Sequence, residues 1–214
     1  MPEIGQTKRL IYAIGVGLFA VAMVAGIIQS MRVNGRLPAV DLLMNGSEAN
    51  IKRLLAQEDY EGAIKELEMK SRIPPADPNT HERLGKLLFR QGRPLEARPH
   101  FQELLRLKPK YAEGHCLLGF THIELNEPVL AEDNFNKAIE LNPEMPSGFY
   151  GLGVAWGQRG ELAHAEKCFA KTAELEPNYP GAQMNLDRVR KELRLAPDRA
   201  KKGEPGAAVD RPRG

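Results

Sequence analysis

The side chains able to do covalent or metal chemistry are few in this 214-residue sequence, which has two cysteines and five histidines. Cys116 and Cys168 fall in no CxxC pair or zinc-ligand spacing and do not suggest a disulfide framework, so the redox compartment stays open. His115 directly precedes Cys116, which raises the question of a reactive thiolate. Adjacent helical residues, however, point about 100° apart. We therefore expect Cys116 to be a small groove residue and Cys168 to be partly buried packing.

His115 and His122 are seven residues apart and share a face of a predicted helix, which would suit two metal ligands. Both stand where a repeated pattern in the sequence places packing residues, so we interpret them as partly buried substitutes for aromatics. The sequence has no glycine-rich phosphate loop, no GxSxG, no HExxH and no paired carboxylates in an apolar setting. The charge run from Asp187 to Arg194 mixes both signs, which indicates a solvated helix face. We predict no catalytic residue, no metal site and no cofactor, and hence no enzyme activity.

Composition narrows the class of protein further. Hydrophobic residues make up 42% of the chain and charged residues 27%, which is ordinary for a folded protein. The formal net charge is +2, and a nucleic-acid binder would be expected to show a strong basic excess. We expect no nucleic-acid partner.

The dominant pattern is a period of 34 residues. Each unit carries a Leu-Gly pair, then an alanine, a phenylalanine four residues later and a closing proline. Two apolar stripes at helical spacing, separated by a turn at Gly92 or Gly160, predict two antiparallel helices in each unit. Small residues let the two helices approach, and the phenylalanine fills the space toward the next unit. Such a hairpin leaves an apolar face uncovered and needs neighbours. The recurring residues are Gly85, Gly119 and Gly153; Ala97, Ala131 and Ala165; Phe101, Phe135 and Phe169; and Pro109, Pro143 and Pro177.

The period and the L-G…A-x-x-x-F…P pattern resemble the tetratricopeptide repeat (TPR) family. The resemblance covers residues 78–111, 112–145 and 146–179 and implies an all-α fold, an α-solenoid of TPR helix hairpins. Pro99 departs from the pattern, because a proline inside a second helix should kink it or cost about 3 kcal/mol.

Weaker copies flank these three units. Residues 44–77 are interpreted as a degenerate repeat, since Ala63 and Pro75 keep the register while Leu67 replaces the phenylalanine and Ile51 the glycine. Residues 180–195 carry Leu186 in register but become charged, as expected of a solvent-facing capping helix.

The N-terminal region contains a nineteen-residue run without a charge, LIYAIGVGLFAVAMVAGII, residues 10–28. As a helix it is about 28 Å long, close to the roughly 30 Å thickness of the hydrocarbon core. It lacks the polar stripe of a buried soluble helix. We predict a transmembrane helix from Leu10 to Ile28. The alternative is a signal peptide cleaved after Ala22, but the apolar run continues past that site.

The orientation of this anchor stays open, because the basic residues before it are nearly balanced by Arg32 and Arg36. The short N-terminal tail, residues 1–9, favours an N-inside anchor. The repeats would then lie in the periplasm of a bacterial inner membrane. Two pairs of small residues would let two anchors pack closely, which admits a homo-oligomer. These pairs are Ala13/Gly17 and Ala22/Gly26.

Two further segments connect or end the chain. Residues 29–43 are predicted to be a juxtamembrane linker, partly helical. Residues 196–214 are rich in Pro, Gly, Ala and charge without an apolar period, so they should be disordered.

The TPR resemblance implies that the first helices of successive units line a concave groove for a protein or peptide partner. Part of this stripe can instead be intramolecular packing, covered by the linker or the capping helix. The predicted groove would have an apolar floor and mixed charge at one rim, which suits an apolar-anchored peptide or helix. The floor consists of Phe89, Phe120, Ile123, Tyr150 and Val154. The remaining groove residues are Asn79, Glu82, Lys86, Arg90, Glu113, Cys116, Glu124, Ser147 and Gln158.

TPR co-chaperones that bind an acidic C-terminal tail resemble one another in a Lys/Asn/Asn/Lys/Arg clamp. The matching positions here lack it, so chaperone-tail binding is disfavoured. They hold Glu82, Lys86, Leu117, Ser147 and Gly151.

The expected function is therefore a non-enzymatic, membrane-anchored adaptor that holds a protein partner, for example during assembly of an envelope or membrane complex. The role in assembling such a complex rests on analogy with other proteins of this fold. A self-associating TPR scaffold, an organelle-surface receptor facing the cytosol and a thiol enzyme using Cys116 are the alternatives.

Overall fold

The computed structural model describes the backbone of residues 38–202 and the side chains of residues 47–195. This part of the chain is all α-helical and contains no strand, as the fold class predicts. The chain divides into two compact units, residues 1–66 and 67–214. The predicted transmembrane helix, Leu10 to Ile28, lies outside the described residues. Within them, each helix is too short or too polar to cross a bilayer.

The first unit contains α2 (Pro38–Ala56) and most of α3 (Tyr60–Ser71). Side chains of α2 hold α3 by hydrogen bonds to one carboxylate, since Ser47 Oγ and Asn50 Nδ2 donate to Glu66 at 3.2 and 2.6 Å. Ile51 and Ala63 are fully buried. Helix α2 begins before the predicted repeat start at residue 44, so residues 38–43 of the predicted linker are helical.

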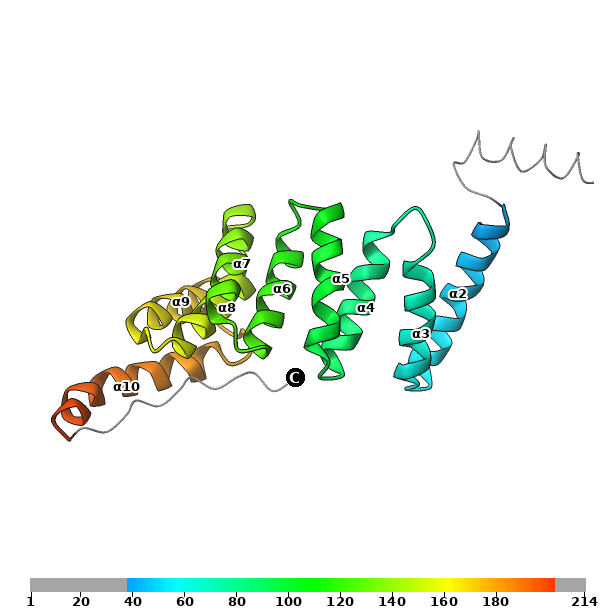
Figure 1. Ribbon diagram of the computed structural model, residues 1–214. Coiled ribbons are helices and arrows are strands. Elements are labelled where there is room, and N and C mark those ends of the chain that lie inside the picture. Colours follow the sequence, from blue (N-terminus) through cyan, green and yellow to red (C-terminus); the bar gives the residue numbers. More distant parts are fainter. Residues whose placement is uncertain (1–37, 203–214) are drawn as a thin grey trace, which may run out of the picture. The chain divides into compact units, whose positions relative to one another are not determined.

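Helix pairs fill the second unit. Each first helix packs on the second helix of its hairpin, and each second helix packs on the next first helix (Figure 1). Asp77 caps the first of these helices by accepting hydrogen bonds from the backbone N–H groups of Asn79 and Thr80. The hairpins are α4 (Pro78–Arg90) with α5 (Pro94–Leu107), α6 (Ala112–Glu124) with α7 (Pro128–Leu141), and α8 (Pro146–Gln158) with α9 (Leu162–Leu175).

The turn inside each hairpin uses one left-handed residue at the same place in the 34-residue period. Gly92 and Gly160 have φ of 70° and 79°, which glycine adopts without steric cost. Asn126 has the same conformation in the second repeat, at φ 59°, and asparagine tolerates it better than most residues. Glu58 has φ 58° between α2 and α3, so this turn also recurs in the first unit although its residue is unsuited to it.

The close approach of two helices depends on a glycine facing a phenylalanine. A Cβ placed on Gly85 would lie 2.6 Å from the ring of Phe101, and the equivalent contacts in the next two repeats are 2.7 and 2.8 Å. All three phenylalanines are fully buried. The ring of Phe135 also lies against Gly151 of the following repeat. The expectation that this ring fills the space toward the next unit is thereby confirmed for Phe135.

Helix α10 (Ala182–Lys202) packs on α9 and ends the stack. Its buried side includes Leu186 and Val189. Gly85, Gly119 and Gly153 each allow the second helix of a hairpin to pack closely. Helix α10 has the exposed Asp187 at the equivalent place in the period. This side of α10 is therefore unsuited to a further hairpin.

One expectation about helix continuity needs correction, and the other, about Pro99, stays untested as to its cost. Helix α10 continues to Lys202, so residues 196–202 of the tail predicted to be disordered are helical, and the rest of that tail lies outside the described residues. The prediction weighed Pro and Gly over the whole tail, but residues 196–202 contain no glycine. Extending an existing helix needs no new nucleation, and Ala, Arg and Lys favour it although Pro197 does not. Helix α5 runs unbroken through Pro99. Pro99 and Leu95, whose carbonyl loses its usual partner, are both exposed, so water can solvate that group.

The Phe135–Gly151 contact predicts the effect of adding one methyl group. Gly151→Ala should lower the free energy of unfolding by about 1–3 kcal/mol, because the fully buried ring has no space to move. This loss should exceed the gain of about 1 kcal/mol in helix propensity. Urea denaturation followed by circular dichroism measures it.

Gly148→Ala in the same helix is the matched control. Its methyl would meet the half-buried Ile139 at 3.0 Å and Cys116 Sγ at an ordinary contact distance of 3.9 Å, so the loss should be smaller. Equal losses in the two variants would contradict the role given to the ring.

Candidate functional site

The fourteen predicted groove residues all lie on the first helices α4, α6 and α8, but they differ in solvent exposure. Four are buried within the second unit and offer almost no surface to a partner. These are Cys116, Ile123, Tyr150 and Val154, with exposed fractions of 3%, 1%, 4% and 0%. The other ten are exposed or half-buried, and they are Asn79, Glu82, Lys86, Phe89, Arg90, Glu113, Phe120, Glu124, Ser147 and Gln158.

The predicted apolar floor is thus much smaller than expected. Only Phe89 and Phe120 of its five members keep accessible surface, and both are half-buried. Phe120 is held in place by an edge-to-face contact with the buried Phe135, with ring centroids 4.9 Å apart. Ile123 and Val154 are enclosed because α6 and α8 pack against each other as well as against their own hairpin partners.

Tyr150 is covered by the capping helix, which confirms one of the two sequence-based alternatives for this residue. Asn185 Nδ2 of α10 donates a hydrogen bond to Tyr150 Oη at 3.0 Å, and both side chains are buried. The ring of Tyr179 lies 5.1 Å from that of Tyr150. Tyr150 therefore stabilises the end of the stack.

One exposed apolar residue was missed on α10. Met184 is 65% exposed and stands 34 residues after Tyr150, at the same place in the period as Glu82 and Cys116. The sequence-based groove stopped at the third repeat, although the register of Leu186 would have extended the row to Met184.

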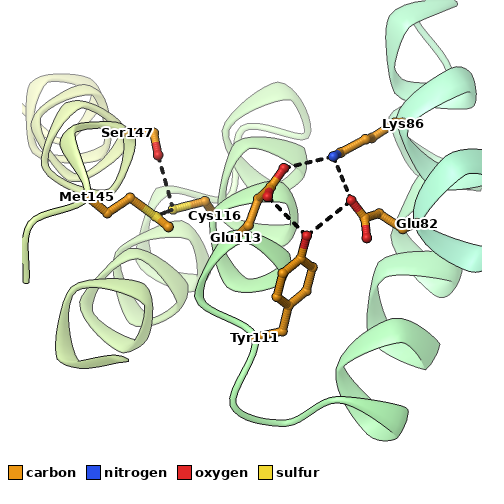
Figure 2. Close-up of polar contacts among 7 residues, drawn as sticks. All are labelled: Glu82, Lys86, Tyr111, Glu113, Cys116, Met145 and Ser147. Carbon is orange, nitrogen blue, oxygen red and sulfur yellow. Dashed lines mark hydrogen bonds and ion pairs between the residues drawn. The ribbon is translucent and has the colours of Figure 1, made fainter. Parts of the chain in front are cut away.

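The polar part of the surface is a cluster that joins α4 to α6 (Figure 2). Lys86 Nζ lies 2.7 Å from Glu82 Oε1 and 2.8 Å from Glu113 Oε1, and so bridges a carboxylate on each helix. Tyr111 Oη lies between the same two carboxylates, 3.2 Å from Glu82 and 3.0 Å from Glu113. We call these four residues the Lys86 cluster.

Hydrogen bonds in the Lys86 cluster favour the charged forms of Lys86 and Glu113. Partial burial alone would lower the pKa of Lys86, but hydrogen bonds to Glu113 and Glu82 outweigh burial and raise the pKa. The hydrogen bond from Lys86 lowers the pKa of Glu113. Burial, followed by the hydrogen bond to Glu113, raises the pKa of Tyr111, so the phenol stays protonated as a donor. Lys86 is therefore a neutralised cation whose donors are directed at carboxylates of its own chain.

Cys116 is unsuited to nucleophilic chemistry. Its Sγ lies 3.3 Å from Met145 Sδ and 3.8 Å from Ser147 Oγ, and burial raises the pKa of the thiol to about 11 (Figure 2). Burial raises the pKa of Cys168 to about 11 as well. Both sulfurs are therefore protonated near neutral pH, contrary to what a thiolate nucleophile requires.

The histidines that suggested metal binding have separate partners. His122 is buried, and its Nδ1 lies 2.6 Å from Glu127 Oε2. Glu127 is also paired with Arg98 of α5 at 3.3 Å, so this chain of contacts joins the first two repeats. His115 Nε2 donates to the backbone carbonyl of Pro109 at 3.1 Å. Among the described residues, no group of three or more His, Cys, Asp or Glu side chains is placed to hold a metal ion.

The family of these hairpins is decided by comparison with known repeats. Residues 78–111 and residues 112–145 each match a tetratricopeptide repeat family model. The chain contains tetratricopeptide repeats. The boundaries of both matches agree with the units recognised from the glycine, phenylalanine and proline pattern. Among curated proteins, no sequence matches the chain significantly.

Solved TPR structures share the fold. The first TPR domain of Spaghetti (RPAP3), bound to the HSP90 peptide SRMEEVD, superposes with a TM-score of 0.53 at 23% identity, covering 55% of this chain and 93% of that one. MamA (residues 41 to the end) from Desulfovibrio magneticus gives 0.63 at 21%, with coverage of 76% and 91%. The Arabidopsis OM64 TPR domain gives 0.52 at 20%, with coverage of 53% and 94%. At these identities the likeness establishes a TPR fold and nothing finer.

The raised thiol pKa values predict slow alkylation in the native protein. A shift of the pKa from 9.0 to about 11 lowers the thiolate fraction roughly a hundredfold at pH 8. We expect iodoacetamide to modify native Cys116 and Cys168 at least that much more slowly than the same residues in guanidinium, as measured by mass spectrometry over time. Alkylation of native Cys116 at the unfolded rate would revive the thiol-enzyme alternative.

Proposed function

We propose that this protein is a membrane-anchored, non-enzymatic TPR adaptor that holds a protein or peptide partner on the exposed surface of α4 and α6. One observation carries the proposal: Phe89 and Phe120 keep accessible surface there, beside the Lys86 cluster, while the neighbouring apolar residues are buried. Aromatic side chains that are half-exposed on a rigid helical surface are typical anchors for a partner.

The chemistry of this surface disfavours an acidic peptide. The RPAP3 domain is bound to the peptide SRMEEVD, whose end is acidic. In this chain Lys86 is engaged by two carboxylates, and Glu82 occupies a clamp position with the wrong charge. Leu117 and Gly151 supply no polar side chain at two further positions. A carboxylate ligand would have to displace Glu82 or Glu113 from Lys86.

The partner that fits best presents an apolar anchor flanked by uncharged or mixed polar groups, as an amphipathic helix does. Phe89 and Phe120 would contact its apolar side. Arg90 and Glu124, at equivalent places at the ends of α4 and α6, would meet charges of either sign.

Attachment to a membrane is part of the proposal and rests on the sequence. The nineteen uncharged residues from Leu10 to Ile28 are long enough to cross a bilayer as a helix. The repeats would then act close to the membrane surface, in the periplasm of a bacterial inner membrane, where an envelope complex is assembled. Association of the anchors into a homo-oligomer is compatible with this arrangement.

Site-specific crosslinking tests the adaptor surface. A benzophenone amino acid in place of Phe120 should give one discrete crosslinked product in cells, because its side chain reaches the α4–α6 surface. The same photoreactive residue at Val129, which is 58% exposed at the start of α7, is the control and should give none. Products are resolved by gel mobility and identified by mass spectrometry. Identical products at the two positions, or none at Phe120, would count against the surface.

Fractionation tests the anchor separately. The full chain should sediment with membranes and resist extraction by carbonate, whereas a variant lacking residues 10–28 should appear in the soluble fraction. A variant with Val21→Arg and Val24→Arg keeps the length of the segment and should also be soluble, since each charge costs about 2.5–3.5 kcal/mol at the centre of a span. Soluble full-length protein would refute the anchor and leave the adaptor surface untouched.

A further inference from the structure

Two imidazoles meet inside the first full repeat. His81 of α4 and His100 of α5 approach with their Nδ1 atoms 3.2 Å apart, and their rings are stacked with centroids at 5.5 Å. His81 is 8% exposed and His100 is half-buried. This pair is a polar contact across the α4–α5 interface.

The other repeats lack this pair. The residues 34 and 68 positions after His81 are His115 and Phe149, and those after His100 are Asn134 and Cys168. The second repeat thus has one imidazole at these two places and the third has none. Of the three repeats, only residues 78–111 carry a histidine at both of these places, where two imidazoles can face each other.

The two nitrogens lie within hydrogen-bond distance of each other. A neutral or singly protonated pair can place one Nδ1–H as donor toward the other Nδ1 as acceptor. When both rings are protonated, both nitrogens are donors, and two like charges face each other in a partly buried interface. The contact is therefore compatible with one positive charge and incompatible with two.

Carboxylates near the pair partly offset the effect of burial on the pKa of His100. Glu68 of α3 and Glu96 of α5 both favour the charged form of His100. Glu103 lies close enough for His81 to lower the pKa of its carboxylate, although its main partner is Arg106. Glu96 is already bound to Arg93. Burial first, and then the neighbouring His81, outweigh these carboxylates and lower the pKa of His100.

The sign of the linkage follows from this direction. Because the folded-state pKa of His100 lies below its ordinary value of 6.5, the unfolded chain binds a proton more readily than the folded chain does. The stability that the neutral ring contributes is complete above about pH 6.5 and is lost as the pH falls from there toward the folded-state pKa.

We propose that the His81–His100 pair makes the α4–α5 hairpin an acid-labile repeat, which opens in acid while the α8–α9 hairpin stays closed. Helix α4 also carries Phe89 and half of the Lys86 cluster, so opening would disassemble the partner surface. That consequence rests on the proposed function. The opening itself does not.

Hydrogen exchange on the full chain in mild detergent with EDTA tests the proposal. After correction for intrinsic exchange rates, protection of α4 and α5 amides should fall about tenfold or more between pH 7.5 and 5.0, relative to α8 and α9 amides. His81→Phe introduces the residue of the third repeat, and His100→Asn that of the second. Each variant should reduce the relative loss to less than about threefold.

Two results would overturn the proposal. One is an equal change of protection in all repeats of the wild-type chain. The other is a wild-type response in a folded His81→Phe or His100→Asn variant, which would show that other groups sense the acid. Circular dichroism at pH 7.5 establishes which variants are folded, and either one is sufficient for the comparison.

Discussion

The contact between a helical glycine and a phenylalanine ring is the constraint on which the stack depends. Each glycine in a helix interior costs about 1 kcal/mol relative to alanine. Burying a phenylalanine contributes about 1.5–3 kcal/mol, so a ring seated on a glycine more than offsets that cost. Phe135 shows the consequence most clearly, because it contacts Gly119 in its own hairpin and Gly151 in the next. One side chain thus sets the spacing within a repeat and between two repeats.

This close packing also explains where a partner can bind. Because the glycines let the helices approach closely, most apolar side chains on the first helices are buried against neighbouring helices. What stays accessible on α4 and α6 includes two half-buried phenylalanines and the Lys86 cluster, whose charges satisfy one another. Under the proposed function, such a surface would select partners by apolar shape rather than by charge.

Most of the fold was predictable from the sequence because it follows from local rules repeated at one period. The glycine turns, the closing prolines and the apolar stripes each predict helix boundaries within a few residues. The site was less predictable. The position in the repeat predicts a groove-facing side chain for Ile123, Val154 and Tyr150 as well as for Phe120. That position tells only on which face of a helix a residue lies. Whether that side is open depends on the distance and angle to helices far along the chain.

The sequence by itself therefore determined the helix hairpins, their order and the absence of an acidic-tail clamp, since these depend on residue type and spacing alone. The tertiary structure decided which side chains are accessible, that α10 covers Tyr150, and that His81 meets His100 across the α4–α5 interface. Burial, pKa and hydrogen bonding are properties of neighbours in space. The 34-residue period shows that the helices stack, but it does not show which side chains will be in contact.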